Sequence, residues 1–201
     1  MKILIIGGNG TIGKKLAARF STKHDIIIAG KNSGDVQVDM SNSESISAMY
    51  EQVGKLDSIV CIAGEAKWAS FSDLSEADYH IGLNSKLMGQ VNITRIGLNY
   101  LNEGGSVTLT TGILGDHPVV MTASAAMVNG AIHSFVKAVA LELTNNHRIN
   151  AVCSDLVEDS LEKYADYFPG HTPVPMHKVV NSYVMCVEGK INGQILRLKE
   201  W

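Results

Sequence analysis

Three glycines near the start of the chain stand at a spacing that suits the binding of a phosphate group. Gly7, Gly10 and Gly13 follow the apolar run Lys2–Ile6 and open a helical stretch, Thr11–Phe20. The first glycine permits a tight turn, the second lets the backbone approach a pyrophosphate, and the third lets the helix pack on the strand. The candidate cofactor-binding residues here are Gly7, Asn9, Gly10, Thr11, Ile12 and Gly13. A tight strand–helix turn without a ligand is the alternative.

The residues after the second apolar run bear on which dinucleotide would bind. A carboxylate at that place would hydrogen-bond the ribose 2′-hydroxyl and select NAD. The sequence instead has Lys31, Asn32 and Ser33, with no carboxylate before Asp35. A lysine beside two small polar residues suits a 2′-phosphate through charge-assisted hydrogen bonds. We therefore predict NADP as the cofactor, with NAD less favoured; the alternative is that Lys31 is an ordinary solvated lysine.

Short apolar runs alternate with longer helical patterns, which is typical of an α/β fold with a parallel sheet. We expect strands over Lys2–Ile6, Asp25–Ala29, Val36–Asp39, Leu56–Ile62, Gly105–Thr111, Arg148–Cys153 and Gln194–Leu198. We expect helices over Thr11–Phe20, Ser43–Val53 with Asn42 as its cap, Ser75–Gly82, Asn84–Leu101, Ser124–Leu143 and Met176–Val187. The glycine-rich turn then lies at the carboxyl end of the first strand.

Two connections between these elements are unusual. Only residues 30–35 join the second and third predicted strands, whereas a parallel crossover normally takes about a dozen residues with a helix. We expect either a bare loop, which would leave one face of the sheet uncovered there, or a wrong strand assignment. The proline-rich stretch 168–175 is interpreted as a lid, part of a small substrate lobe around residues 155–176 within a single domain spanning 1–201.

The composition excludes several classes of protein. The chain has 201 residues, with 17 Lys and Arg against 20 Asp and Glu, which gives a net charge of −3. This balance argues against a nucleic-acid or anionic-membrane partner, since both need concentrated positive charge. No apolar run approaches the roughly 18 residues that span a bilayer, and the first run is too short for a signal peptide. The three cysteines lack metal-binding spacing, so we expect no metal, reduced thiols and a cytoplasmic location.

Several of these segments together resemble the short-chain dehydrogenase/reductase family. The resemblance rests on the glycine-rich turn, Asp39-Met40, Ala63-Gly64, Ile149-Asn150-Ala151-Val152 and Ala140-Leu141-Glu142-Leu143. It implies a Rossmann-type doubly wound parallel sheet of about seven strands, in which the family's helix between the second and third strands is missing. It also implies that Asp39 and Met40 lie beside the adenine, and Ala63 and Gly64 beside the adenosine ribose. Because family members often pair through two long central helices, we expect a homodimer or homotetramer.

The family's catalytic signature, Tyr-x-x-x-Lys, is absent. In that signature a lysine lowers the pKa of the tyrosine, which then donates a proton to a carbonyl. An alignment anchored on residues 140–143 places Ala125 at the tyrosine and Asn129 at the lysine, and no tyrosine of the chain has a lysine four residues later. The family's Pro-Gly beside the nicotinamide is replaced by Ser154-Asp155. The Asp155 carboxylate would repel an anion unless it is turned away or paired with Lys86.

Three other residues are candidates for the missing catalytic groups. Lys86 falls at the position of the family's catalytic asparagine, where it could hold a carbonyl or phosphate oxygen; a surface lysine is the alternative, and Asn84 is a rival for the asparagine role. Thr111, at the end of the fifth predicted strand, could orient a substrate through its hydroxyl, or be a strand-forming residue only. His117, in the following loop, could donate a proton, or be a merely exposed histidine.

One helix carries a polar line on an otherwise apolar surface. Asn129, His133 and Lys137 recur every four residues, which we interpret as the one wet or partner-facing stripe of a buried helix. Taken together, the residues predict an atypical NADP-dependent reductase that acts on a small carbonyl or enone. The alternative is a non-catalytic NADP-binding protein that serves as a sensor or structural subunit.

Overall fold

One parallel sheet forms the centre of the molecule in the computed structural model, which describes residues 1–200. Its strand order is β3-β2-β1-β4-β5-β6-β7, so the chain winds outward from β1 in both directions. The strands are β1 (Lys2–Ile6), β2 (Asp25–Gly30), β3 (Val36–Gln37), β4 (Leu56–Cys61), β5 (Leu101–Gly112), β6 (Arg148–Ser154) and β7 (Ile195–Leu198). The predicted Rossmann-type sheet of seven strands is therefore confirmed.

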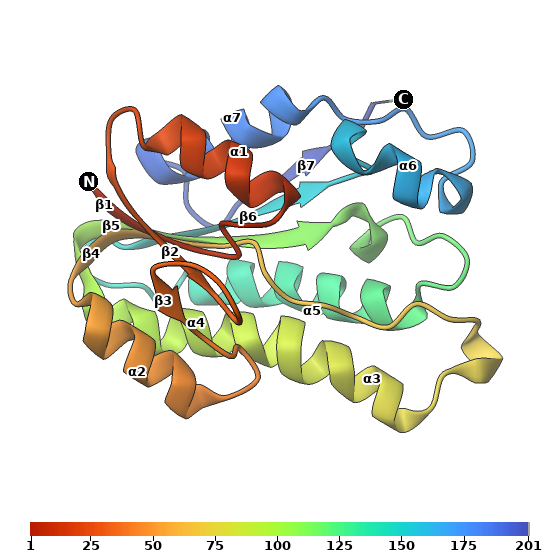
Figure 1. The fold of residues 1–201 in the computed structure, drawn as a ribbon, viewed down its shortest axis with the longest axis horizontal. Helices are drawn as coiled ribbons and strands as arrows, with labels where there is room; N and C mark the ends of the chain where they lie inside the picture. Colours follow the sequence, from red (N-terminus) through yellow and green to blue (C-terminus); the bar gives the residue numbers. More distant parts are fainter. Residues whose placement is uncertain (201) are drawn as a thin grey trace.

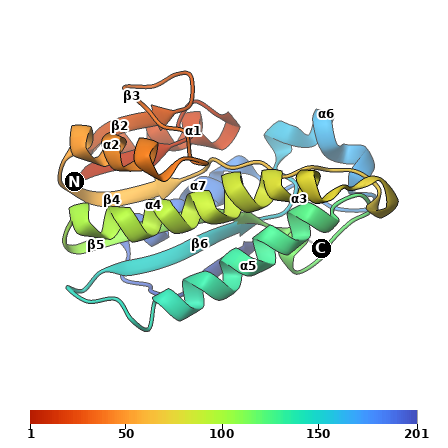
Figure 2. The same cartoon turned by 90° about the horizontal axis from the view of Figure 1, so that it is seen from below.

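Helices cover both faces of this sheet (Figure 1). They are α1 (Thr11–Phe20), α2 (Ser43–Val53), α3 (Glu76–Gly82), α4 (Gly89–Gly97), α5 (Ala123–Val139), α6 (Leu161–Tyr164) and α7 (Met176–Glu188). Helices α1 and α7 lie on one face, while α2, α4 and α5 lie on the other, where α4 and α5 are neighbours (Figure 2). Within the described residues, no helix combines the length and the apolar character needed to cross a membrane.

The alternation of side chains along β1 explains why the sheet needs both layers. Ile3 and Ile5 belong to the apolar cluster under α1 and α7, whereas Leu4 and Ile6 belong to the cluster on the other face. All four are at most 1% exposed. A strand with apolar residues in every position is stable only where both faces are covered, as is usual in parallel sheets.

The connection between β2 and β3 is a bare loop, which is the first of the two alternatives that the sequence left open. Asp35 binds this loop to β2 in place of the contacts that a helix would make. Its backbone N–H donates to the Ile28 carbonyl and its carboxylate accepts the Ile28 N–H, each at 2.8 Å. Gly34 has φ +126°, and a Cβ there would come 2.6 Å from the Ile28 oxygen. Ile26 and Ile28 remain half-buried, so this edge of the sheet is only partly covered.

The predicted helix Asn84–Leu101 differs from the observed element. A π-helical stretch, Leu83–Met88, joins α3 to α4 without interruption, and α4 ends at Gly97. The widening of one turn changes which side chains face the sheet, and π-helical turns are common at functional sites. Helix α5 ends four residues earlier than predicted, at Val139. The predicted cap of α2 is confirmed, since the Asn42 side chain accepts N–H bonds from Glu44 and Ser45.

Candidate functional site

The glycine-rich turn lies at the carboxyl end of β1, and its geometry requires glycine at two of the spaced positions. Gly7 has φ +84°, and a Cβ there would come 3.1 Å from the backbone nitrogen of Ala63. A Cβ on Gly13 would come 2.2 Å from the Gly7 oxygen. Gly10 caps α1 without a side-chain hydrogen bond, and the first turn of the helix has no acidic residue. No carboxylate of the helix start competes with an anion at this end of α1.

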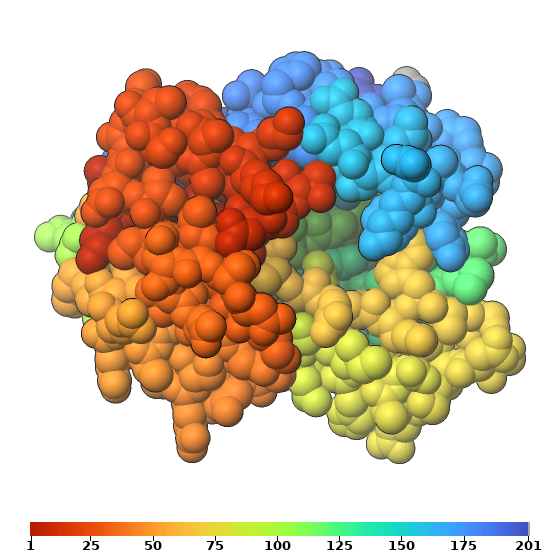
Figure 3. Space-filling model, in the orientation of Figure 1, coloured from red at the N-terminus to blue at the C-terminus, as the bar shows by residue number. Residues whose placement is uncertain are grey.

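Two adjoining cavities lie across the carboxyl ends of the strands, and Ile12 of this turn lines the second. The first measures about 560 Å³ and is lined by five of the predicted cofactor-binding residues: Lys31, Asp39, Met40, Ala63 and Gly64. The second measures about 400 Å³ and shares Gly64 and Glu65 with the first, so that together they form one groove. Figure 3 shows this hollow between the N-terminal part of the chain, the yellow segment and the blue lobe. Its position is where ligands bind in open α/β sheets.

A polar corner stands at the outer end of the first cavity. Lys31 donates to the Asp39 carboxylate at 2.9 Å, and Asn9 donates through Nδ2 to the Ser33 hydroxyl at 3.0 Å. Hydrogen bonds from Ser41 and Lys31 lower the pKa of Asp39 to about 2, while the bond to Asp39 raises the pKa of Lys31. The structure thus brings Asn9, Lys31 and Ser33 together, and Asn32 lies exposed beside them.

Aromatic side chains from two distant segments close over the second cavity. Trp68 packs against Tyr164 and Phe168, with ring centroids 5.4 and 6.3 Å away, and all three line the cavity. Tyr167 meets the same indole edge-on at 5.2 Å. Trp68 lies about a hundred residues before the others along the chain, and no local pattern in the sequence indicates that they meet. Residues of the predicted lobe around 155–176 therefore form one wall of the groove.

Lys86 lies in the π-helical stretch and lines the second cavity. Gly64, with φ +118°, packs so closely that a Cβ on it would come 2.9 Å from the Lys86 Cα. The surrounding protein desolvates the amine and lowers the pKa of Lys86, and none of the described residues hydrogen-bonds the amine or pairs with it. Its rival Asn84 lines the first cavity instead. Of the two, the structure therefore brings Lys86 to the inner cavity.

The two positions of the missing signature also face this cavity. Ala125 and Asn129 both line it, one turn apart on α5. Asn129 is 4% exposed, and its Oδ1 is buried without a hydrogen-bond partner among the described residues. A buried acceptor without a partner costs free energy, so a hydrogen-bond donor that reached this oxygen would stabilise it.

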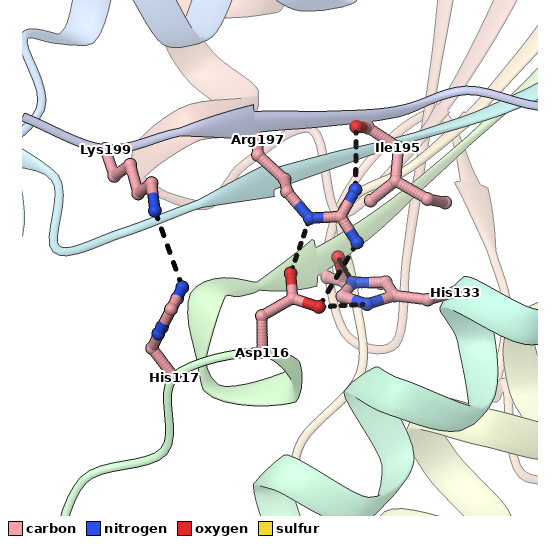
Figure 4. Close-up of polar contacts among 7 residues, drawn as sticks. Asp116, His117, His133, Ile195, Arg197 and Lys199 are labelled. Atoms are coloured by element: carbon pink, nitrogen blue, oxygen red, sulfur yellow. Dashed lines mark hydrogen bonds and ion pairs between the residues drawn. The ribbon is translucent and has the colours of Figure 1, made fainter.

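Thr111 lies at the end of β5 and also lines the second cavity, with a histidine directly behind it. Its Oγ1 lies 2.8 Å from His133 Nε2, and His133 Nδ1 lies 3.6 Å from Asp116 Oδ1. Arg197 binds both oxygens of that carboxylate, at 2.7 and 3.2 Å (Figure 4). Burial lowers the pKa of His133, and the hydrogen bond from Arg197 lowers the pKa of Asp116.

This arrangement changes the interpretation of the polar line on α5. Asn129 and His133 are 4% and 5% exposed, so they are not on a wet stripe; only Lys137 is exposed. His117, the histidine proposed from the sequence, is exposed and contacts Lys199, outside the residues that line either cavity (Figure 4). The structure thus brings Lys86 and Thr111 to the inner cavity, does not bring His117 there, and adds His133.

The residues around Asp116 and His133 include three side chains of the types that bind metal ions. The ligand atoms of Asp116, His133 and Cys153 lie within 4.8 Å of one another. Both oxygens of Asp116 already bind the Arg197 guanidinium, whose positive charge opposes a cation at the same place. Burial also raises the pKa of Cys153 to about 11, which disfavours the thiolate that a metal needs. The contacts therefore fit a hydrogen-bonded network better than a metal centre.

Asp155 is turned away from Lys86. Its carboxylate lies 2.7 Å from His171 Nδ1 and accepts the Leu156 N–H at 2.7 Å. The side chain is 1% exposed, so both bonds are withdrawn from water. Of the two arrangements considered for this carboxylate, the structure shows the one in which it is turned toward the lobe, where it anchors residue 171.

The comparisons with known proteins agree with this geometry. A family model described as enoyl-(acyl carrier protein) reductase matches residues 9–174. The oxidoreductase UcpA of Escherichia coli is 30% identical over 129 residues, 61% of this chain and 48% of its own length, so the match spans about half of that relative. The uncharacterized oxidoreductase YmfI of Bacillus subtilis is 24% identical, with 96% of this chain and 95% of its own covered.

Solved structures match across the whole fold. The protein lin1944 of Listeria innocua has a TM-score of 0.96 and 43% identity, and 98% of each chain is covered. A small-chain dehydrogenase in complex with NADPH has a TM-score of 0.88 and 25% identity, and 99% of this chain and 96% of that one are covered. With the fold, the glycine-rich turn and the family model in agreement, the chain belongs to the short-chain dehydrogenase/reductase family.

Proposed function

We propose that this protein binds NADPH and reduces a small carbonyl compound or enone. The observation that carries the proposal is the continuous groove, with the polar corner of Lys31 at one end and Lys86 beside Thr111 at the other. The turn at Gly7–Gly13 would hold the pyrophosphate at the start of α1. Asp39 and Met40 would lie beside the adenine, and Ala63 and Gly64 beside its ribose.

NADP is favoured over NAD by the groups around the expected 2′ position. Lys31, Asn9 and Ser33 offer one cation and two neutral polar groups there. The Asp35 carboxylate is engaged with the Ile28 N–H, so it does not compete for a ribose hydroxyl. A 2′-phosphate would take over Lys31 from Asp39, because a phosphate offers more charge and more acceptor oxygens than one carboxylate. The NADPH complex of the related small-chain dehydrogenase supports the same choice.

The residues of the inner cavity suit a substrate oxygen that gains negative charge. When bound, NADPH supplies the hydride that reduces the carbonyl carbon. The amine of Lys86 and the hydroxyl of Thr111 would hold the carbonyl oxygen, in place of the family's tyrosine. The free Oδ1 of Asn129 would accept a ribose hydroxyl, in place of the family's lysine. Trp68 and the lobe would exclude water from the reacting atoms.

The same proposal covers assembly and location. Helices α4 and α5 would form the interface of a homodimer or homotetramer, since they lie on the same face of the sheet (Figure 2), and the π-helical stretch before α4 exposes Met88 while α5 exposes Met127, each 44% accessible. The three cysteines are free and buried, which suits a reducing, cytoplasmic compartment. The expected partner of the groove is a small molecule, with no role for nucleic acid or a membrane.

The test begins with binding. Titrations of NADPH and NADH, followed by nicotinamide fluorescence, should show tight NADPH binding and weaker NADH binding. NADPH consumption is then measured with cyclohexanone, cyclohex-2-enone, benzaldehyde and 2,3-butanedione. Lys86→Ala should slow turnover at least tenfold, because charge stabilisation at a reacting oxygen commonly contributes 10²-fold or more. The matched control is Lys23→Ala, an exposed lysine that lines neither cavity.

The results separate two functions. Failure of both cofactors to bind at millimolar concentration would contradict the proposal. Tight NADPH binding without turnover of any carbonyl favours the second candidate, a non-catalytic NADP-binding sensor or structural subunit. The observation in favour of that candidate is specific: Ala125 and Asn129 stand in the cavity wall where the family has its tyrosine and lysine.

A further inference from the structure

The contacts behind Thr111 form a chain that leads from the inner cavity to the surface. Thr111 meets His133 at 2.8 Å, His133 faces Asp116 at 3.6 Å, and Asp116 is held by Arg197 on β7. The Asp116 and Arg197 side chains are 25% and 39% exposed, whereas that of His133 is 6% exposed. A buried imidazole thus stands between a hydroxyl in the cavity wall and a carboxylate that water reaches.

We infer that His133 is a positioning residue that sets whether the Thr111 hydroxyl donates to, or accepts from, the molecule in the cavity. A carboxylate only accepts hydrogen bonds, so Nδ1 of His133 carries the hydrogen that faces Asp116. In the neutral ring, Nε2 is then an acceptor and binds the Thr111 hydrogen, which leaves only oxygen lone pairs toward the cavity. In the protonated ring, Nε2 donates to Thr111, and the Thr111 hydrogen is free to bind a substrate oxygen.

The packing around the ring keeps this choice to two states. A Cβ on Gly115 would come 2.9 Å from Cε1 of His133, so the turn after β5 lies directly against the imidazole. The ring has no room to swing away from Thr111 without moving that turn. The titratable and charged groups around it are Asp116 after β5, Arg197 on β7, Cys153 on β6 and Lys137 on its own helix, while His117 acts on Asp116.

The surroundings of His133 act on its protonation in opposite directions. Burial lowers the pKa of His133 below 6.5, while the Asp116 carboxylate opposes that change. The inference rests on the proposed carbonyl reduction for its chemistry. As the carbonyl carbon is reduced, the carbonyl oxygen forms an O–H bond with the Thr111 proton, and Thr111 regains a proton from Nε2 of His133. The ring is left neutral and takes its next proton from water, which is the one proton that the reduction consumes.

The sign of the pH dependence follows. Reduction through Thr111 needs the protonated ring, so its rate should fall as pH rises through the pKa of His133. Oxidation of the product alcohol needs an acceptor at Thr111, so its rate should rise over the same interval. Lys86 donates as well, so a residual rate of reduction is expected above the pKa of His133, and this rate should fall in turn as Lys86, whose own pKa is lowered, loses its proton.

The first test uses no turnover at all. Long-range ¹H–¹⁵N correlation spectra of the uniformly labelled protein report the tautomer and the pKa of each histidine. We expect the Nδ1–H tautomer for His133 in the neutral form, and an Nε2 resonance shifted by its hydrogen bond. Thr111→Val should abolish that shift with the tautomer retained, and Asp116→Asn should lower the pKa further. An Nε2–H tautomer, or an Nε2 resonance unchanged in Thr111→Val, would overturn the inference.

The second test follows the rate of carbonyl reduction between pH 5 and 9. His133→Gln keeps a polar side chain of similar reach that does not titrate. Its kcat should be at least tenfold lower than that of the wild type at the acid end, and its rate should no longer change with pH across the pKa of His133. Its KM and its Kd for NADPH should stay within twofold of the wild-type values. His147→Gln is the control. His147 is also buried, at 8% exposure, but it hydrogen-bonds the Asn102 carbonyl at the amino ends of the strands, whereas the groove lies at their carboxyl ends. An unchanged pH profile in His133→Gln would refute the inference. If NADPH fails to bind, the proposed function falls and the spectra alone decide the state of His133.

Discussion

Replacing Lys86 by methionine should raise stability while it removes activity, and the size of the gain should depend on pH. Methionine has nearly the length and volume of lysine, so the contacts of the side-chain stem with Gly64 and the cavity wall are kept. The substitution removes only the amine, which the surrounding protein partly desolvates and which has no partner among the described residues. An ionised group in such a place destabilises the fold, and an apolar one of the same shape does not.

The magnitude follows from proton linkage. The pKa of Lys86 is lowered from 10.5 in the folded protein, so over the interval between the lowered value and 10.5 the unfolded chain binds more protons. The free energy of unfolding of the wild type therefore rises with pH across this interval, by up to about 1.4 kcal/mol per pH unit. The advantage of Lys86→Met should be greatest at the low-pH end and should vanish as the pH approaches 10.5.

The assay is urea unfolding followed by circular dichroism at several pH values between 6 and 10. The difference between the two proteins isolates Lys86, because all other titrating groups are common to both. Lys23→Met, at an exposed site, should show no pH-dependent difference. A constant difference across this range, or a Lys86→Met protein that is less stable throughout, would refute the claim that the amine is held in a desolvated state. NADPH consumption measured on the same samples should be lost in Lys86→Met only.

Three further predictions concern the groove and the outer helices. Lys31→Ala should weaken NADPH binding by about tenfold and leave NADH binding unchanged, because only NADPH has the phosphate that this cation would pair with; equal losses for both cofactors in the fluorescence titration would contradict the assignment. Trp68→Ala should loosen the lobe, since each aromatic pair contributes about 0.5–1.5 kcal/mol, and trypsin should then cleave faster after Lys163. Phe71→Ala is the control, because this side chain is 78% exposed, and it should not change the cleavage rate. Met127→Glu should shift the protein to monomers in light scattering if α4 and α5 form the interface, and an unchanged mass would exclude that helix face.

The parts of the fold that were predicted correctly are those that depend on local sequence. The apolar run of β1, the three spaced glycines and the short loop between β2 and β3 are each explained within a few residues of chain. The helix predicted over Asn84–Leu101 was only partly right, because a π-helical turn leaves no mark in the apolar spacing. Its position depends on how Gly64 packs against Lys86, which is a contact between segments 22 residues apart.

The site was predicted in part for the same reason. Lys86 and Thr111 follow from their positions in the family pattern, and both line the inner cavity. His133 was assigned to a wet or partner-facing stripe because its spacing from Asn129 and Lys137 is helical, and spacing alone does not say which side of a helix is buried. The signal that identifies it is the loop after β5, where Gly115 makes room for the ring and Asp116 faces it. Only the packing of α5 against β5, β6 and the turn after β5 brings these groups together.

The cation of the inner cavity enters from a different element than in the family pattern. There, a lysine on the long helix lies one turn from the tyrosine; here, that helix offers Ala125 and Asn129, and Lys86 enters from the π-helical stretch that faces it across the cavity. Lys137 on α5 already stands one turn from His133, and its charge opposes protonation of the ring. A second lysine at position 129 would stand one turn away on the other side and add to this effect. With the cation on the opposite wall of the cavity, the ring is spared that second nearby charge.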